Sequence, residues 1–422
     1  MTVLLKNGYI VDGKSREGVF DILIEDKLIS IIAKDINFPA DKTIDCTGLT
    51  VIPGICDMHV HLRDPGQTHK EDLISGGEAA AAGGVTAVLC MPNTSPVIDT
   101  PEIIRDIIER GKASKVKIYV CASITKGLQG KKLNDFKELR KAGAVAVSDD
   151  GRPVENARLM SEALVKARAA GLKVISHCEN LDITGKGIIN EGKISEKLEV
   201  EGVSRSSENI MVLRDMCLAH DLRASIHITH VSTKEAAVYI KAFTERGIMA
   251  TCDTTPHYFT LTEDSLMKQD ADYRMSPPLR EFEDVMEITK ALCNDVFDCI
   301  ASDHAPHTPD EKSDFHSAPN GVIGLETLLP VTLTRLYHTG KLPLMKIVRL
   351  LCINPRRILG IGTGGLEAGG MADIAVFDLN KQWVVNPEKL HSKSKNTCFK
   401  GMRVKGRIKY TLVNGEIVYE DK

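Results

Sequence analysis

Between residues 50 and 306, eight short strand-like segments alternate with stretches long enough for a helix. The strand-like segments are Ile55–His61, Thr86–Met91, Lys117–Ala122, Ala144–Asp149, Lys173–His177, Ser225–His230, Ile248–Cys252 and Asp298–Ser302. The helical stretches include Lys70–Ala82, Pro101–Lys112, Leu133–Ala142, Asn156–Ala170, Ser207–His220 and Thr233–Arg246. Parallel strands need crossovers of this length, and eight repeats favour a closed barrel over an open sheet. The sequence therefore predicts an α/β fold with a (β/α)8 TIM-like barrel.

The two ends of the chain show short strands separated by turn residues instead of strand–helix units. The predicted strands are Thr2–Leu5, Tyr9–Val11, Asp21–Glu25, Leu28–Ile32, Thr43–Asp45, Ala372–Asp378, Ile408–Val413 and Glu416–Glu420. Asn414-Gly415 is a hairpin turn signal. We expect one small β-sandwich domain formed by residues 1–52 and 365–422, with the catalytic barrel at residues 53–364. The loop at 180–205 is long and polar. It is either a lid over the site or an insertion that takes no part in it.

Composition narrows the classes of partner. The formal net charge is −3 and no basic run occurs, so we expect no nucleic-acid partner. No apolar run reaches the length of a membrane span, and the first residues lack the regions of a signal peptide. The eleven cysteines are scattered and form no Cys-x-x-Cys pair, which favours buried free thiols in a reducing cytoplasm.

His59 and His61, separated by one residue, are the clearest sign of chemistry. On an extended strand, residues i and i+2 point to the same side, so both imidazoles can reach one metal ion. The same alternation predicts a second face, suited to packing under a helix, made of Cys56, Met58, Val60 and Leu62. A lone His-x-His is weak evidence, because two histidines also occur in cores and on surfaces. It gains weight from ligands elsewhere in the chain.

Further ligand side chains stand at the ends of the other predicted strands, which converge on one face of a barrel. They are Asn93, Asp149, Asp150, His177, His230, His257 and Asp303. Alternation along 144–150 puts the small side chains 144, 146 and 148 on the inward face with Asp150, and Val145 and Val147 outward. A turn aspartate before Gly151 is the alternative for Asp150. Cys299 and Ala301 are predicted to face inward with Asp303. His230 shares a face with Ile226 and Ile228, whereas His227 does not and is interpreted as structural.

Four histidines and two carboxylates are too many for one tetrahedral zinc ion but suffice for two divalent ions that share a carboxylate. Two such ions can bind a bridging hydroxide and polarise a carbonyl oxygen. A carboxylate beside that hydroxide can take its proton during attack and return it to a leaving nitrogen. We assign this role to Asp303, and the predicted reaction class is amide hydrolysis.

Three polar residues near these strand ends are candidate substrate contacts. Arg63 can grip a carboxylate as a two-point fork. Asn93 adds a neutral donor and His307 a cationic one. The alternatives are a surface ion pair for Arg63, with Asp64 or Glu71, and a helix cap or turn for Asn93. An anionic substrate is predicted but not required.

These segments together resemble the amidohydrolase superfamily and, within it, the class I dihydroorotases. The motif Ser302-Asp-His-Ala-Pro-His-Thr308 is the most specific, and the resemblance spans almost the whole chain. The other motifs are Asp57-Met-His-Val-His-Leu-Arg-Asp-Pro-Gly66, Met91-Pro-Asn-Thr94, Ser148-Asp-Asp-Gly151, His177-Cys-Glu179, Ile228-Thr-His-Val-Ser232, Glu311-Lys312, Gly321-Val-Ile-Gly-Leu-Glu326 and Ala372-Asp-Ile-Ala-Val-Phe377.

The resemblance implies a metallo-dependent hydrolase barrel and a zinc-dependent, reversible cyclisation of N-carbamoyl-L-aspartate to (S)-dihydroorotate in de novo pyrimidine biosynthesis. It implies two Zn²⁺ ions per chain. The first would be held by His59, His61 and Asp303, the second by His177 and His230, with Asp150 as the bridge. Arg63, Asn93 and His307 match positions that bind the substrate carboxylate, and Asn320 and Gly321 match a loop that offers backbone groups to the ring. A homodimer and association with aspartate transcarbamoylase are partners that the resemblance allows.

The sequence departs from the pattern of its relatives at two places. Many relatives bridge the metals with a carboxylated lysine late in the fourth barrel strand, but no lysine occurs between Lys141 and Lys166. Asp150 must therefore be the bridge, which counts against hydantoinase-like or allantoinase-like activity. Ser276, a predicted substrate contact, stands where the family usually shows Asn and reaches less far.

Two other functions are the alternatives. Another cyclic-amide hydrolase is the nearest, and the missing lysine and Arg63 discriminate against it. A non-catalytic scaffold, for example beside aspartate transcarbamoylase, belongs to a different class. Such relatives usually lose metal ligands, whereas all six candidate positions here carry suitable side chains.

Overall fold

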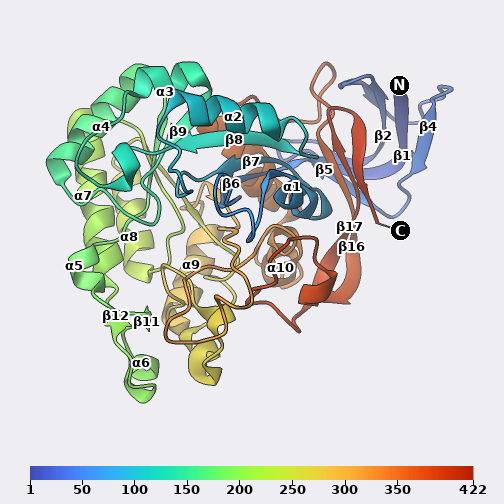
Figure 1. The fold of residues 1–422 in the computed structure, drawn as a ribbon. Helices are drawn as coiled ribbons and strands as arrows, with labels where there is room; N and C mark the ends of the chain where they lie inside the picture. The colour runs from blue at the N-terminus through green and yellow to red at the C-terminus, as the bar shows by residue number, and fades with distance from the viewer. Residues whose placement is uncertain (422) are drawn as a thin grey trace.

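A computed structural model describes residues 1–421, and its centre is an eight-stranded parallel barrel (Figure 1). The strands follow the order β15-β14-β13-β10-β9-β8-β7-β6, and the ring closes where the His61 N–H donates to the His304 carbonyl at 2.8 Å. The strands are β6 (Ile55–Val60), β7 (Val85–Cys90), β8 (Lys117–Ala122), β9 (Ala144–Val147), β10 (Lys173–Ser176), β13 (Ile226–Ile228), β14 (Ala250–Thr254) and β15 (Cys299–Ile300). The predicted (β/α)8 barrel is confirmed.

Helices follow successive strands and cover the outside of the barrel (Figure 1). They are α1 (Leu73–Ala82), α2 (Pro101–Gly111), α3 (Phe136–Ala142), α4 (Ala157–Ala170), α7 (Ser206–Leu222), α8 (Lys234–Thr244) and α9 (Phe282–Cys293). Helix α2 illustrates how the sequence sets them. The Thr100 hydroxyl caps its first turn, Pro101 opens it, and Ile104 and Ile107 on one face are buried against the barrel. No helix among residues 1–421 has the length and apolar character needed to cross a membrane.

Two regions extend the simple strand–helix pattern. The chain after β15 continues into α10 (Leu328–Thr332), η4 (Leu333–Tyr337), α11 (Leu344–Val348), η5 (Arg349–Ile353) and α12 (Asn354–Leu359). The polar segment 180–205 contains α5 (Leu181–Thr184), β11 (Ile189–Asn190), α6 (Lys193–Lys197) and β12 (Gly202–Val203), and its α6 end projects from the body (Figure 1). Single 3₁₀ turns are η1 (Lys126–Leu128), η2 (Glu263–Lys268), η3 (Ala271–Tyr273) and η6 (Pro387–Lys389).

Both ends of the chain build one mixed sheet, ordered β18-β17-β16-β5-β1-β2-β3, with β4 also paired to β1. Its strands are β1 (Thr2–Val11), β2 (Glu17–Glu25), β3 (Leu28–Ala33), β4 (Lys42–Asp45), β5 (Thr50–Pro53), β16 (Ile374–Val384), β17 (Arg403–Val413) and β18 (Glu416–Glu420). The two strands predicted in 2–11 are one, because a bulge at Asn7 (φ 61°) carries the chain through. The domain boundaries after residues 52 and 364 stay predictions.

The predicted faces of β6 are wrong in part. Cys56 and Met58 lie inside the barrel, in a cluster with residues from five other strands, whereas Ile55 and Val60 pack in the outer core with the helices. The pairing of β6 with β7 shifts register between Asp57 and Val60, and this interrupts the strict alternation on which the prediction rested.

Strands β9 and β13 show the same kind of correction. Ala146 lies inside, but Ala144 joins the outer core with Val147, and partly buried Val145 packs against the interior cluster. Ile226 and Ile228 also face the outer core, so His230 does not share their face in the predicted way. The chain has left the strand by then, and a left-handed backbone at His230 (φ 41°) redirects its side chain.

Candidate metal centre

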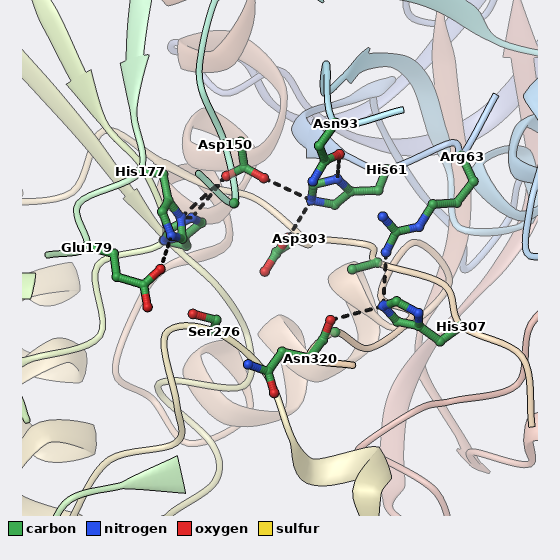
Figure 2. A pocket seen from close by; sticks show the side chains of 14 residues that line it. His61, Arg63, Asn93, Asp150, His177, Glu179, Ser276, Asp303, His307 and Asn320 are labelled. Carbon is green, nitrogen blue, oxygen red and sulfur yellow. Dashed lines mark hydrogen bonds and ion pairs between the residues drawn. The ribbon is translucent and has the colours of Figure 1, made fainter. Parts of the chain in front are cut away.

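Six side chains predicted as metal ligands converge at the carboxyl end of the barrel. Asp150 lies between His61 on one side and His177 on the other, with Asp303 below it (Figure 2). The six come from five places in the ring: His59 lies on β6 and His61 directly after it, and Asp150, His177, His230 and Asp303 lie just after β9, β10, β13 and β15. All six are at most 6% exposed.

The ligand atoms form two groups that share Asp150. In the first, His59 Nε2 lies 3.3 Å from Asp150 Oδ1, and His61 Nε2 lies 3.5 Å from Asp150 Oδ2. Asp303 Oδ1 belongs to this group, 3.3 Å from His61 Nε2 and 3.6 Å from His59 Nε2. In the second, His177 Nδ1 and His230 Nε2 are 2.9 Å apart, and each is 3.5 Å from Asp150 Oδ1.

These separations fit bound metal. Ligands held about 2.1 Å from one tetrahedral zinc ion lie about 3.4 Å from one another. In addition, His59 Nε2 and Asp150 Oδ1 are buried and have no hydrogen-bond partner among the described residues. Leaving a buried polar atom unpaired costs free energy. A cation bound by both His59 Nε2 and Asp150 Oδ1 would satisfy the two atoms. The donor set therefore fits one or two divalent cations.

The electrostatics of the cluster also favour positive charge. Burial lowers the pKa of His59, but Asp150 and Asp303 more than offset this and raise it to about 9. Burial disfavours the Asp303 carboxylate, yet the His61 hydrogen bond and the neighbouring imidazoles lower its pKa to about 2. The pKa of Asp150 is likewise held well below its usual range, against burial, by His59, His177 and His230. Both carboxylates are thus ionised, which is the form that binds a cation.

Residues other than the six candidate ligands orient the histidines. Asn93 Oδ1 accepts from His61 Nδ1 at 2.8 Å, which leaves His61 Nε2 as a lone pair aimed at the carboxylates. Thr229 Oγ1 lies 2.8 Å from His59 Nδ1 and donates to Asp253, so it accepts from that nitrogen. Each hydrogen bond selects the tautomer that a metal ligand needs.

In the second group, His177 is oriented through its ring and His230 is held through its backbone. Glu179 Oε2 accepts from His177 Nε2 at 2.9 Å, which frees His177 Nδ1 for the cluster. Asp253 accepts the His230 backbone N–H at 2.6 Å and bonds His227 Nε2 at 2.8 Å. His227 therefore lies under the site as a support. Glu179 and Thr229 stood in motifs noted in the sequence, whereas no local pattern pointed to Asp253.

Three site residues have left-handed backbones, a conformation that is uncommon outside glycine: Arg63 (φ 59°), His230 (φ 41°) and Asp303 (φ 48°). Such conformations cost of order 1 kcal/mol each and persist where the surroundings impose them. Their concentration in one site shows that tertiary contacts, and not local preference, set the direction of these side chains.

The cluster opens into a cavity of about 290 Å³ that the predicted substrate contacts also line (Figure 2). Arg63, Asn93, Ser276, His307, Asn320 and Gly321 all line it. We call Arg63, Ser276, His307, Asn320 and Gly321 the substrate wall. Every predicted site residue except His59 lines this cavity, and His59 lies against the lining residues Asp150 and Asp303. The roles of these residues remain predictions.

Arg63 and His307 are coupled within this wall. Arg63 Nε donates to the Pro306 carbonyl at 3.1 Å, and one Nη lies 3.1 Å from His307 Nε2. Burial and the Arg63 charge lower the pKa of His307 to about 3, so the imidazole is neutral and not the cationic donor expected. Burial lowers the pKa of Arg63 to about 10, which leaves it charged at neutral pH. Arg63 is thus the cation of the wall.

The loop at Asn320 and Gly321 is tightly held. The Gly321 N–H donates to the Arg274 carbonyl at 3.0 Å, and its carbonyl accepts from Asn396 at 3.0 Å. A side chain at Gly321 (φ 136°) would come within 2.7 Å of the Ala305 methyl group, so only glycine fits. Both backbone groups of Gly321 are therefore engaged within the protein.

Comparisons with known proteins agree with this geometry. Residues 50–418 match the model of the "Amidohydrolase family". The chain belongs to the amidohydrolase family. Curated relatives named "Dihydroorotase" include those of Geobacter metallireducens, 45% identical, and Acetivibrio thermocellus, 43% identical. Each alignment spans 100% of this chain, and 100% and 99% of the relative.

Solved structures with the same fold carry other names. An "L-Hydantoinase (Dihydropyrimidinase) from Arthrobacter aurescens" is 26% identical with a TM-score of 0.90, and the match covers 99% of this chain and 96% of that one. A dihydropyrimidinase from Brevibacillus agri is 24% identical with a TM-score of 0.89, covering 100% and 96%, and shows the fold alone. The fold is therefore shared by amidohydrolases with different names, and the site must discriminate among them.

Proposed function

We propose that this amidohydrolase is a dihydroorotase, which interconverts N-carbamoyl-L-aspartate and (S)-dihydroorotate in de novo pyrimidine biosynthesis. The full-length similarity to dihydroorotases supports the assignment. The observation that carries it is Arg63, a buried cation that lines the same cavity as the candidate metal ligands. Dihydroorotate has a carboxylate to pair with it, whereas hydantoin and allantoin rings do not.

The substrate carboxylate binds Arg63 in this proposal. One Nη and the Nε are held by His307 and Pro306, and the other Nη has no acceptor in residues 1–421. Holding part of the guanidinium fixes its plane, so little freedom is lost on binding a carboxylate. Asn93, whose oxygen is occupied by His61, has its amide nitrogen free for substrate, and Ser276 and Asn320 line the same cavity.

Asp303 moves the proton. Its carboxylate, ionised at neutral pH, takes the proton that water loses on attacking the ring amide and returns it to the ring nitrogen as the amide bond breaks. Ring closure runs through the same group in reverse. The six candidate ligands, with Asp150 shared by the two groups, would hold two zinc ions, and these would supply polarisation of the attacked carbonyl and a lowered pKa of the attacking water.

We also propose a cytoplasmic location and two protein partners for this enzyme. All eleven cysteines are free, which is compatible with a reducing cytoplasm. A homodimer and association with aspartate transcarbamoylase are proposed partners. Light scattering of the purified chain, alone and mixed with the transcarbamoylase, tests both, and a monomer in both samples would refute them.

The first experiment incubates zinc-supplemented protein with dihydroorotate, hydantoin or allantoin and follows the absorbance of the ring. We expect turnover of dihydroorotate alone, abolished by a chelator and restored by zinc. Turnover of another ring with none of dihydroorotate would reassign the substrate wall while keeping the metal centre. No turnover of any ring by zinc-loaded protein would favour the non-catalytic scaffold.

A further inference from the structure

Two loops build the far side of the cavity, and one buried lysine lies between them. The Ser276 loop, residues 271–277, begins with η3, and the Asn320 loop, residues 312–321, directly precedes Val322, which pairs with His304 at the barrel. Lys312 opens the second loop, is 8% exposed, and does not itself line the cavity.

The Lys312 ammonium makes three hydrogen bonds, all to backbone carbonyls. Its Nζ donates to Ala271 at 2.9 Å and Arg274 at 3.2 Å on the Ser276 loop, and to Pro319 at 2.8 Å on the Asn320 loop. An ammonium has three donors, so the set is complete. Ser276 follows the second of these carbonyls by two residues, and Asn320 follows the third directly.

No carboxylate lies within ion-pair distance of Lys312 in the described residues. The acidic groups of the facing loop, Asp270 and Asp272, are instead paired with Lys400 at 2.6 and 3.0 Å. Burying an ammonium without a paired carboxylate is costly, and here the three carbonyls offset that cost, helped by the more distant charges of Asp272 and Asp270. Burial lowers the pKa of Lys312 to about 8, which keeps it charged at neutral pH.

The link between the loops is reciprocal. The Arg274 side chain donates to the carbonyls of Phe315 and His316, and the Arg274 carbonyl accepts both the Gly321 N–H and Lys312. Each loop thus carries a buried cation that binds the backbone of the other. Loops without regular secondary structure need such bonds to hold side chains in a fixed place.

We propose that Lys312 is a positioning residue for substrate binding, which sets the spacing between Ser276 and Asn320 across the ring. The proposal rests on the proposed function. Lys312 contacts no metal ligand, so its loss weakens substrate binding and leaves the metal centre intact. That pattern separates it from the residues that orient the histidines.

The test is Lys312→Met, which keeps the length of the side chain and removes the three donors. We expect KM for dihydroorotate to rise about tenfold or more, kcat to stay within about threefold, and the zinc content to be unchanged. The matched control is Lys346→Met. Lys346 Nζ donates to one backbone carbonyl, that of Cys293, and pairs with Asp295, with no contact to the cavity. Its loss should lower stability without changing KM.

Hydrogen exchange gives a second readout that needs no turnover. The Gly321 amide, bonded to Arg274, should exchange faster in Lys312→Met than in the wild type and in Lys346→Met. If Lys312→Met does not fold, Lys312→Arg replaces it in the experiment, because arginine keeps the positive charge but not the compact ammonium group. In this variant the exchange rate of the Gly321 amide should lie between those of the wild type and a full loss of the three bonds. An unchanged KM together with unchanged exchange would overturn the proposal, as would loss of zinc with KM unaltered.

The same experiments separate this proposal from the proposed function. Wild-type protein that is inactive on dihydroorotate refutes the function. In that case, faster exchange of the Gly321 amide in Lys312→Met than in the wild type still supports the link between the loops. Exchange at the wild-type rate in this variant refutes that link.

Discussion

The two sides of the cavity are built in different ways. On the metal side, every ligand lies on or just after a barrel strand, and second side chains such as Asn93, Thr229 and Glu179 orient the imidazoles. On the substrate wall, Ser276, His307 and Asn320 lie on long loops, held largely by bonds to backbone carbonyls.

The difference indicates a division of labour. A barrel rim fixes ligand atoms to within the tolerance that a metal requires, because neighbouring strands hold one another in register. Loops can change in length and sequence without disturbing the barrel, so substrate choice can vary on an unchanged metal centre. Substitutions on the metal side should therefore affect kcat and metal affinity, and those on the wall should affect KM.

The largest effect is expected for Asp303→Asn. Loss of the proton carrier and of one metal ligand should reduce kcat by about 10³-fold or more, because general acid–base catalysis alone contributes 10²–10⁴-fold. Steady-state kinetics at matched zinc content measure this. Asp310→Asn, an exposed carboxylate on the same loop, is the control and should leave kcat unchanged. Undiminished turnover by Asp303→Asn would remove the residue from the mechanism.

Arg63→Ala tests the other side of the comparison. Losing a charged hydrogen-bonding partner of a carboxylate should raise KM for dihydroorotate by about 10–100-fold while zinc content stays constant. Initial rates over a range of substrate concentrations separate KM from kcat. Wild-type kinetics in Arg63→Ala would mean that the substrate carboxylate binds elsewhere. A fall in kcat without a change in KM would mean that Arg63 acts with the metal centre and not in substrate binding.

Thr229→Val should act on the metal and not on the substrate. Without the hydroxyl acceptor, His59 loses the bond that selects its tautomer, and zinc affinity should fall by about tenfold. Competition with a chromophoric chelator measures that affinity. Thr251→Val is the matched control, since the Thr251 hydroxyl bonds His227 at 2.8 Å and no predicted ligand. Equal zinc affinity in both variants would show that the Thr229 contact does not matter.

The smallest effect is expected for Ser276→Ala. A neutral hydrogen bond contributes about 0.5–1.5 kcal/mol, so KM should rise by about two- to tenfold with kcat and zinc binding preserved. Comparing this variant with Ser276→Asn, the side chain usual in the family, asks whether a longer group binds more tightly. A loss of zinc in either variant would contradict the separation of the two sides.

Local sequence pattern was enough to predict the barrel and, together with the family resemblance, the six candidate ligands that the structure brings together. The strands and helices repeat with recognisable periods, and strand ends meet at one rim whatever the details of packing. The faces of β6, β9 and β13 were not predictable in the same way. A register shift in β6 and the left-handed turn at His230 break the alternation, and both follow from contacts with neighbouring segments.

The sequence alone determined which reactive groups are present and that they meet at one rim of the barrel. It did so because the strands and helices are predicted from hydrophobic periods of a few residues, and the reactive groups follow those strands. Only the tertiary structure decided how those groups are held. Thr229 supports His59 from 170 residues away, Asp253 supports His230 from 23, and Lys312 binds a carbonyl 41 residues distant. Such pairings depend on how strands and loops pack together, and no local pattern in the sequence encodes them.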